Sequence, residues 1–119
     1  MGDFEKLTVA VKARHLALGV YRVTEAFPKQ ERYGLTSQLR RAAVSVGANL
    51  AEGSGRYTDQ DFRRFVGIAR GSASELEFLL GIAKGLGLND VDALNGLIRD
   101  TREVNRMLSG LRRALTAGS

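Results

Sequence analysis

The sequence has no cysteine, and only one proline and one histidine in 119 residues. Without cysteine there can be no disulfides, thiolate metal sites or cysteine nucleophiles. The longest apolar runs are only a few residues, too short to span a membrane, and the first residues lack the apolar run of a signal peptide. We therefore expect a cytoplasmic protein without a membrane-spanning segment.

The polar residues form no pattern typical of an enzyme or a metal site. His15 has no carboxylate three or four residues away that could orient it as a base. Glu75 and Glu77 lie on different faces of a helix, so they cannot act together as an acid–base pair. The stretch Gly53-Ser54-Gly55-Arg56 lacks the Lys-Ser/Thr ending of a phosphate-binding loop. We expect no catalytic residue, no metal and no cofactor.

The single proline and the scarcity of alternating β-branched residues argue against a sheet. Apolar residues spaced alternately by three and four positions predict four helices, at residues 9–26, 37–52, 59–86 and 90–117 of a single domain, 1–119. The expected N-caps are Thr8, Thr36, Thr58 and Asn89. Gly53 is the expected left-handed stop of the second helix. Because all connections are short, the sequence predicts an all-α, antiparallel, up-down-up-down four-helix bundle.

The third predicted helix has a second apolar stripe beside its core stripe, formed by Phe65, Ile68, Leu79 and Ile82. Two explanations stay open: this stripe contacts another subunit, or the central helix has a wide core face. Phe78 also lies at a position that we expect to be largely buried, so no aromatic platform for stacking nucleobases is predicted.

The second predicted helix has a stripe of small and polar residues, which includes Asn49 and Glu52. These two residues could form a polar site, but we favour internal hydrogen bonding. Glu52 is expected to accept from backbone N–H groups at the start of the third helix, or to pair with Arg56 or Arg70.

Arginine dominates the charge: 14 arginines and 4 lysines against 13 acidic residues give +5. In an antiparallel bundle, many of these arginines would meet at one end. The residues expected there, and the candidates for binding nucleic acid, are Arg14, Arg56, Arg63, Arg64, Arg106, Arg112 and Arg113. An ordinary solvated surface is the simpler alternative.

Several stretches together resemble a known family. They are the run from Phe27-Pro28-Lys29 through Asn49-Leu50-Ala51-Glu52-Gly53 to Arg56, then Ile68-Ala69-Arg70-Gly71-Ser72, and Glu75-Leu76-Glu77. The chain resembles the bacterial four-helix-bundle family encoded in intervening sequences of 23S rRNA genes, which is also described as ribosomal-protein-like. It departs from the family at Ala10, where a tryptophan is usual, and at Leu88, where an aromatic residue is common.

The resemblance implies a ring-shaped homo-oligomer, typically a pentamer. Relatives include the accessory protein of diversity-generating retroelements, which works with a reverse transcriptase and nucleic acid. Two functions follow as expectations: a non-enzymatic protein that binds nucleic acid, with RNA favoured, or an adaptor that docks on a reverse transcriptase or ribosomal component. Salt would distinguish them, because phosphate binding weakens steeply with ionic strength.

Overall fold

The computed structural model describes residues 3–117. The chain forms helices α1 (Asp3–Thr24), α2 (Leu35–Ser54), α3 (Asp59–Gly85) and α4 (Val91–Ala117), with a short 3₁₀ helix, η1 (Lys29–Glu31), between α1 and α2. No strand occurs in this part of the chain. The predicted all-α class and the number of long helices are confirmed.

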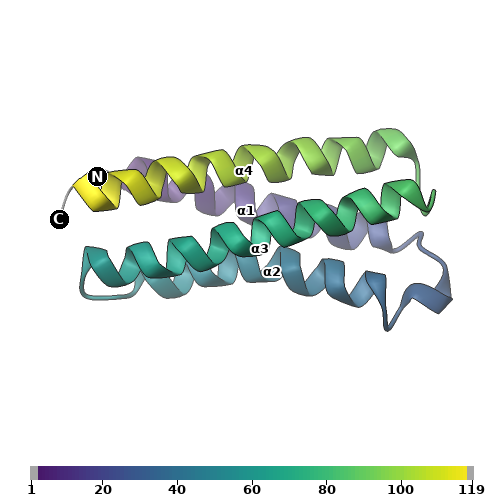
Figure 1. The fold of residues 1–119 in the computed structure, drawn as a ribbon, viewed down its shortest axis with the longest axis horizontal. Helices are drawn as coiled ribbons and strands as arrows, with labels where there is room; N and C mark the ends of the chain where they lie inside the picture. The colour runs from purple at the N-terminus through teal and green to yellow at the C-terminus, as the bar shows by residue number, and fades with distance from the viewer. Residues whose placement is uncertain (1–2, 118–119) are drawn as a thin grey trace.

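The four long helices lie side by side in an elongated body of 46 × 24 × 18 Å. Figure 1 shows the α1–α2 and α3–α4 connections at one end, and the α2–α3 connection at the other. Helix α2 packs against α1 and α3, whereas α4 packs against α3 and α1. The two longest helices, α3 and α4, therefore lie along each other and form one long face.

The predicted apolar stripes form the core. At steps of three and four residues, these stripes run from Ala13 to Phe27, from Leu39 to Gly53, from Phe62 to Ala83 and from Leu94 to Leu115. Val23 is partly buried, and every other member of the four stripes is buried. The only polar member, Thr101, is buried with its hydroxyl donating to the Leu97 carbonyl at 2.7 Å. The largest fully buried side chains include Leu16, Leu39, Leu50, Leu76, Leu80, Leu94, Leu108 and Leu115. Because burying a leucine contributes about 1.5–3 kcal/mol, this core is the main source of stability.

Two predicted helix starts were wrong. Helix α1 begins at Asp3, so Thr8 lies inside the helix and is not its N-cap. Helix α2 begins at Leu35 after Gly34, and no side chain caps it. Thr36 is instead buried in its first turn, next to the buried Leu35. Burial of this first turn against the core decides where α2 begins.

The other two helix starts have side-chain caps. The predicted cap of α3 is confirmed, because the Thr58 hydroxyl accepts from the Asp61 backbone N–H at 3.1 Å. The predicted cap of α4 was one residue early: the Asp90 carboxylate accepts from the Asp92 backbone N–H at 3.1 Å. Asn89 instead donates to the Val23 carbonyl at 2.8 Å, which fastens the α3–α4 connection to α1.

Gly53 does not end α2 in a left-handed conformation, as we had predicted. The helix ends at Ser54, and the C-cap residue that follows, Gly55, has φ −87°. Among the described residues, Gly87 alone has a positive φ, 67°. Gly53 is buried, and a Cβ atom there would lie 2.6 Å from the Cβ of Phe65. The glycine is needed because α2 and α3 approach each other closely at this point.

Candidate nucleic-acid interface

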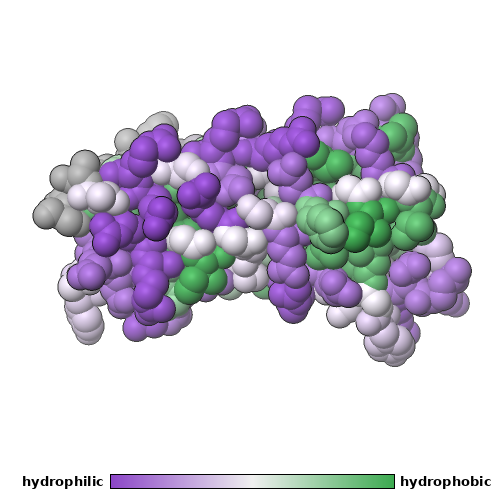
Figure 2. All heavy atoms as spheres, viewed as in Figure 1, coloured by the Kyte–Doolittle hydropathy of each residue, from purple (hydrophilic) through white to green (hydrophobic). Residues whose placement is uncertain are grey.

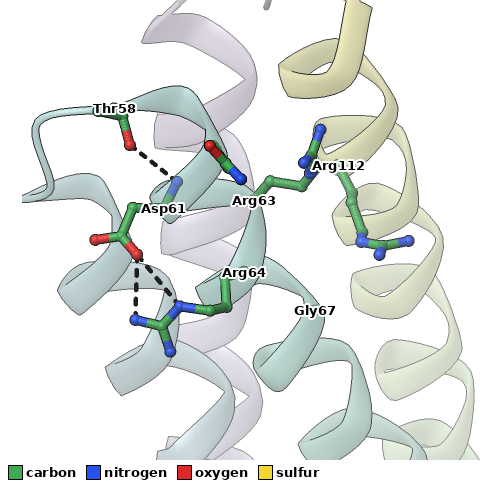
Figure 3. Close-up of a pocket in the computed structure, with 7 residues that line it drawn as sticks. Thr58, Asp61, Arg63, Arg64, Gly67 and Arg112 are labelled. Carbon is green, nitrogen blue, oxygen red and sulfur yellow. Dashed lines mark hydrogen bonds and ion pairs between the residues drawn. The ribbon is translucent and has the colours of Figure 1, made fainter.

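Two of the hollows along the surface between α3 and α4 are rich in arginine, which supplies six of their thirteen lining residues. The first, which we call the end hollow, has a volume of about 500 Å³ and lies at the start of α3. Figure 3 shows Arg63 extending from α3 towards α4, where Arg112 lies, while Arg64 turns back to Asp61. The residues that line it are Thr58, Gln60, Asp61, Arg63, Arg64, Gly67 and Arg112.

Only one of the three arginines in the end hollow is neutralised by a carboxylate. The Asp61 carboxylate accepts from Arg64 at 3.2 Å (Nε) and 3.1 Å (Nη2). Arg63 donates to the Thr116 hydroxyl at 3.4 Å, a neutral partner. Among the side chains described, residues 8–116, no carboxylate pairs with Arg63 or Arg112. The end hollow therefore presents two unneutralised guanidinium groups.

The second hollow, which we call the middle hollow, lies further along the same two helices and has a volume of about 230 Å³. Its lining residues are Arg70, Glu77, Arg102, Asn105, Arg106 and Ser109. Arg102 Nε donates to Glu77 Oε2 at 2.9 Å, so these two charges neutralise each other. Arg106 is exposed and makes no ion pair with the carboxylates of residues 8–116, although its charge interacts with that of Glu103 about one helical turn away.

The two hollows together concentrate the positive charge of the molecule. Six arginines and two acidic residues line them, a balance of 6 − 2 = +4. The whole chain carries +5. Figure 2 shows this part of the α3–α4 face as a largely hydrophilic surface. A polyanion lying along the two helices would meet guanidinium groups over the length of both hollows.

The structure separates the seven arginines that we had grouped. Arg63, Arg64, Arg106 and Arg112 line the two hollows, and Arg113 is exposed one residue after Arg112. Arg14 lies on α1, which packs against α2 and α4 and makes no contact with α3 in the described part of the chain.

Arg56 lies in the α2–α3 connection and does not line these hollows, and several partners hold it. It donates to Glu52 at 2.7 Å and lies 3.8 Å from Asp61. Its guanidinium also stacks over the Phe65 ring, 4.7 Å from the centroid. The predicted Glu52–Arg56 pair is thus confirmed, although Glu52 is exposed and bonds neither to the start of α3 nor to Arg70.

Asn49 makes the internal hydrogen bonds that we had favoured. Its amide donates to the Ser45 carbonyl at 2.9 Å and to the Ser45 hydroxyl at 3.0 Å. The Ser45 hydroxyl in turn lies 2.8 Å from that of Ser72, which joins α2 to α3. Arg70, which we had placed near Glu52, instead faces α4 and lines the middle hollow.

The second apolar stripe of α3 is split by its environment. Phe65 and Leu79 are buried within the chain, so they are not available to another subunit. Ile68 and Ile82 are 43% and 37% exposed. Phe78, which we had expected to be buried, is 69% exposed and lines a hollow with Ile98 and Arg102 of α4. Figure 2 shows a hydrophobic surface where the last turns of α3 lie beside the first turns of α4.

Arg102, Asn105 and Ser109 line the middle hollow but were not among the predicted site residues. A signal was present, because these three residues and Arg112 follow steps of 3, 4 and 3 along one side of α4. These four residues lie on α4 beside its buried apolar stripe, so their side chains face the neighbouring helix, α3.

Other classes of site find no support in the described part of the chain. The described side chains, those of residues 8–116, contain no cluster of three or more His, Cys, Asp or Glu that could hold a metal ion. No helix within residues 3–117 has the length and apolar content needed to cross a membrane.

Comparison with known proteins agrees with this fold. A crystal structure of a protein of unknown function from the S23 ribosomal protein family of Bacteroides thetaiotaomicron is 20% identical to this chain, with a TM-score of 0.85 over 92% of this chain and 98% of that one. No match was found among curated proteins. The model of the 23S rRNA-intervening sequence protein family matches residues 5–110. This match covers most of the chain, and the protein therefore belongs to that family.

Proposed function

We propose that this protein is a non-enzymatic, cytoplasmic protein that binds nucleic acid, with RNA favoured, through the arginines between α3 and α4. The observation that carries the proposal is the excess of arginine over carboxylate in the two hollows, where Arg63, Arg106 and Arg112 form no ion pair with the carboxylates of residues 8–116. The planar guanidinium group binds phosphate oxygens through two parallel hydrogen bonds, so these side chains suit a phosphodiester backbone.

We further propose that antiparallel, up-down-up-down bundles assemble into a ring, with a pentamer favoured, through the outer face of α3. Ile68, Phe78 and Ile82 are exposed on that face. Cβ atoms added to Gly71 or Gly81 of the same helix would meet nothing within 4 Å. Each glycine costs a helix about 1 kcal/mol relative to alanine, a cost that close approach of a second helix would offset. A ring would also repeat the arginine hollows and strengthen a weak contact.

Binding should be tested by fluorescence anisotropy with single-stranded RNA, duplex RNA and duplex DNA, at about 50 and 200 mM salt. The test variant is the double substitution Arg63→Gln and Arg112→Gln. Its matched control, Arg22→Gln with Arg32→Gln, removes the same charge from exposed positions outside the hollows. The test variant should lower the salt slope for a single strand by about 1.4, or 0.7 per lost phosphate contact. Equal losses in both variants would contradict the proposed site.

The alternative is an adaptor that docks on a protein, such as a reverse transcriptase or a ribosomal component. The exposed apolar surface around Phe78 and Ile82 favours it, since such a surface suits a protein partner. Docking through this surface would depend little on salt and would survive loss of Arg63 and Arg112.

A further inference from the structure

Tyr57 presents a free aromatic ring at the end of the bundle where the end hollow lies. The residue belongs to the α2–α3 connection, and its relative exposure is 105%, so the whole side chain faces solvent. Within the described part of the chain, no guanidinium group stacks over this ring. Tyr57 lines a hollow of about 730 Å³, which we call the tyrosine hollow. The other lining residues are Ala48, Ala51, Glu52, Gly55, Arg56, Thr58 and Asp61.

The tyrosine hollow suits an uncharged ligand better than a phosphate. Its charged lining residues are Arg56, Glu52 and Asp61, a balance of 1 − 2 = −1. Arg56 pairs with Glu52 at 2.7 Å and lies 3.8 Å from Asp61, so its guanidinium group is already occupied. Ala48 and Ala51 have small apolar side chains and leave room beside the ring of Tyr57. A flat, neutral, aromatic group matches this combination of charge and shape.

The tyrosine hollow adjoins the end hollow, because Thr58 and Asp61 line both. Figure 3 shows these two residues at the start of α3, with Asp61 bonded to Arg64. The Asp61–Arg64 pair, at 3.1 Å, reduces the repulsion that this carboxylate would exert on a passing phosphate. A strand whose phosphates contact the arginines of the end hollow can therefore bring a base to Tyr57.

The backbone on both sides of Tyr57 is fixed by hydrogen bonds. On one side, the Arg56 N–H donates to the Gly53 carbonyl at 3.0 Å. On the other, the Thr58 hydroxyl accepts from the Asp61 N–H at 3.1 Å and caps α3. Because this connection is ordered before a ligand binds, less conformational entropy is lost when a ligand contacts the ring.

We propose that Tyr57 stacks on an unpaired nucleobase while the end hollow holds the neighbouring phosphates, so that the protein recognises single-stranded nucleotides; this inference rests on the proposed nucleic-acid binding. Every base has a flat π face, so stacking on an aromatic side chain binds single strands with little regard to sequence. Inside a duplex the faces of the bases are covered by their neighbours, and only unstacked bases are free to contact an aromatic ring.

The test compares three probes of about 12 nucleotides by fluorescence anisotropy: single-stranded RNA, its duplex, and a ribose–phosphate strand without bases. Tyr57→Ala should lower the affinity for the single strand about tenfold and leave the affinities for the other two probes unchanged. Tyr57→Phe keeps the ring and should bind like the wild type. The matched control is Tyr33→Ala, which removes an 87% exposed tyrosine from the α1–α2 connection at the opposite end of the bundle.

Stacking on this ring can also be observed directly. The chain contains no tryptophan, so Tyr57→Trp introduces a single indole at this position. Its fluorescence should be quenched when the single-stranded RNA binds, because a base then covers the indole, and it should change little with the strand that lacks bases. Tyr33→Trp is the control and should respond to neither probe.

The outcomes separate the inference from the proposed function. An unchanged affinity of Tyr57→Ala for the single strand, or an equal loss in Tyr33→Ala, would overturn the stacking contact and leave nucleic-acid binding intact. A smaller assembly in Tyr57→Ala, measured by light scattering, would assign the ring to a subunit contact and overturn the inference. Failure of the wild type to bind any probe would overturn the proposed function and this inference with it. Thermal unfolding checks that each variant is folded.

Discussion

Gly53 of α2 lies directly against Phe65 of α3. A Cβ atom on Gly53 would lie 2.6 Å from the Phe65 Cβ and 2.9 Å from Phe62 Cδ1, closer than carbon atoms can approach without displacement. The close approach depends on glycine having no side chain. It also places Phe65 where Arg56 and Arg64 stack over its ring, at 4.7 and 4.5 Å.

Gly53→Ala should therefore lower the free energy of unfolding by about 1–3 kcal/mol, because the added methyl group must push α2 and α3 apart. Gly96→Ala is the matched control on α4, where the nearest atom is the movable end of Arg99, 3.7 Å away. It should raise stability by up to about 1 kcal/mol, since alanine favours the helix. Urea unfolding measures both, and a Gly53→Ala protein as stable as the control would refute the steric role.

Thr58→Ala should destabilise the protein by about 1 kcal/mol, because it removes the cap that accepts from the Asp61 N–H. Thr58→Ser keeps the hydroxyl and should stay close to the wild type. Thermal unfolding of the three proteins tests this. Equal melting temperatures for the alanine and serine variants would show that the cap contributes nothing.

Glu52→Gln should lower stability only slightly, by about 0.3–0.5 kcal/mol. Glu52 is 58% exposed and pairs with Arg56 one helical turn away, and exposed pairs at this spacing are weak. Differential scanning calorimetry at low and high salt measures the effect, which should shrink as salt screens the pair. An unchanged melting temperature at low salt would mean that Glu52 contributes no stability through its charge.

The ion pair between Lys12 of α1 and Glu103 of α4, at 2.7 Å, should affect titration at both extremes of pH. The hydrogen bond and charge of Lys12 lower the pKa of Glu103, and those of Glu103 raise the pKa of Lys12. The carboxylate's contribution to stability is therefore present above its unfolded pKa and is lost as pH falls through the lowered value. The ammonium's contribution is present below its unfolded pKa and is lost as pH rises through the raised value.

This pair can be tested by NMR titration of the Glu103 carboxyl carbon. In Lys12→Met the pKa of Glu103 should rise towards its ordinary value, whereas Arg22→Met on the same helix should leave it unchanged. A Glu103 pKa that is the same in the wild type and in Lys12→Met would show that the pair does not form in solution.

Ile68→Asp and Phe78→Asp should each reduce the size of the assembly, if the outer face of α3 is the subunit contact. A charge buried between subunits would have no partner, so association should weaken. Leu18→Asp is the matched control, because Leu18 is an equally exposed apolar residue on α1. Size-exclusion chromatography with light scattering measures the mass. Assemblies of wild-type size in both test variants would place the contact elsewhere.

The helices and the core could be predicted from the order of the residues. Apolar residues at steps of three and four define one face of a helix whatever packs against it, so the buried stripe from Leu94 to Leu115 could be predicted before the fold was known. The cap at Thr58 was predictable for the same reason, since it depends on residues only three positions apart.

How separate helices face one another could be seen only in the folded chain. Gly53 looked like a helix stop, because its contact with Phe65 lies twelve residues away and depends on the distance between two helices. Phe78 looked like a core residue, because the apolar residues of α3 do not by themselves show which face of this helix is covered by other helices. Arg70 and Asn105 meet in one hollow because α3 and α4 pack together. The candidate site is a product of this packing, whereas the helices that carry it follow from local periodicity.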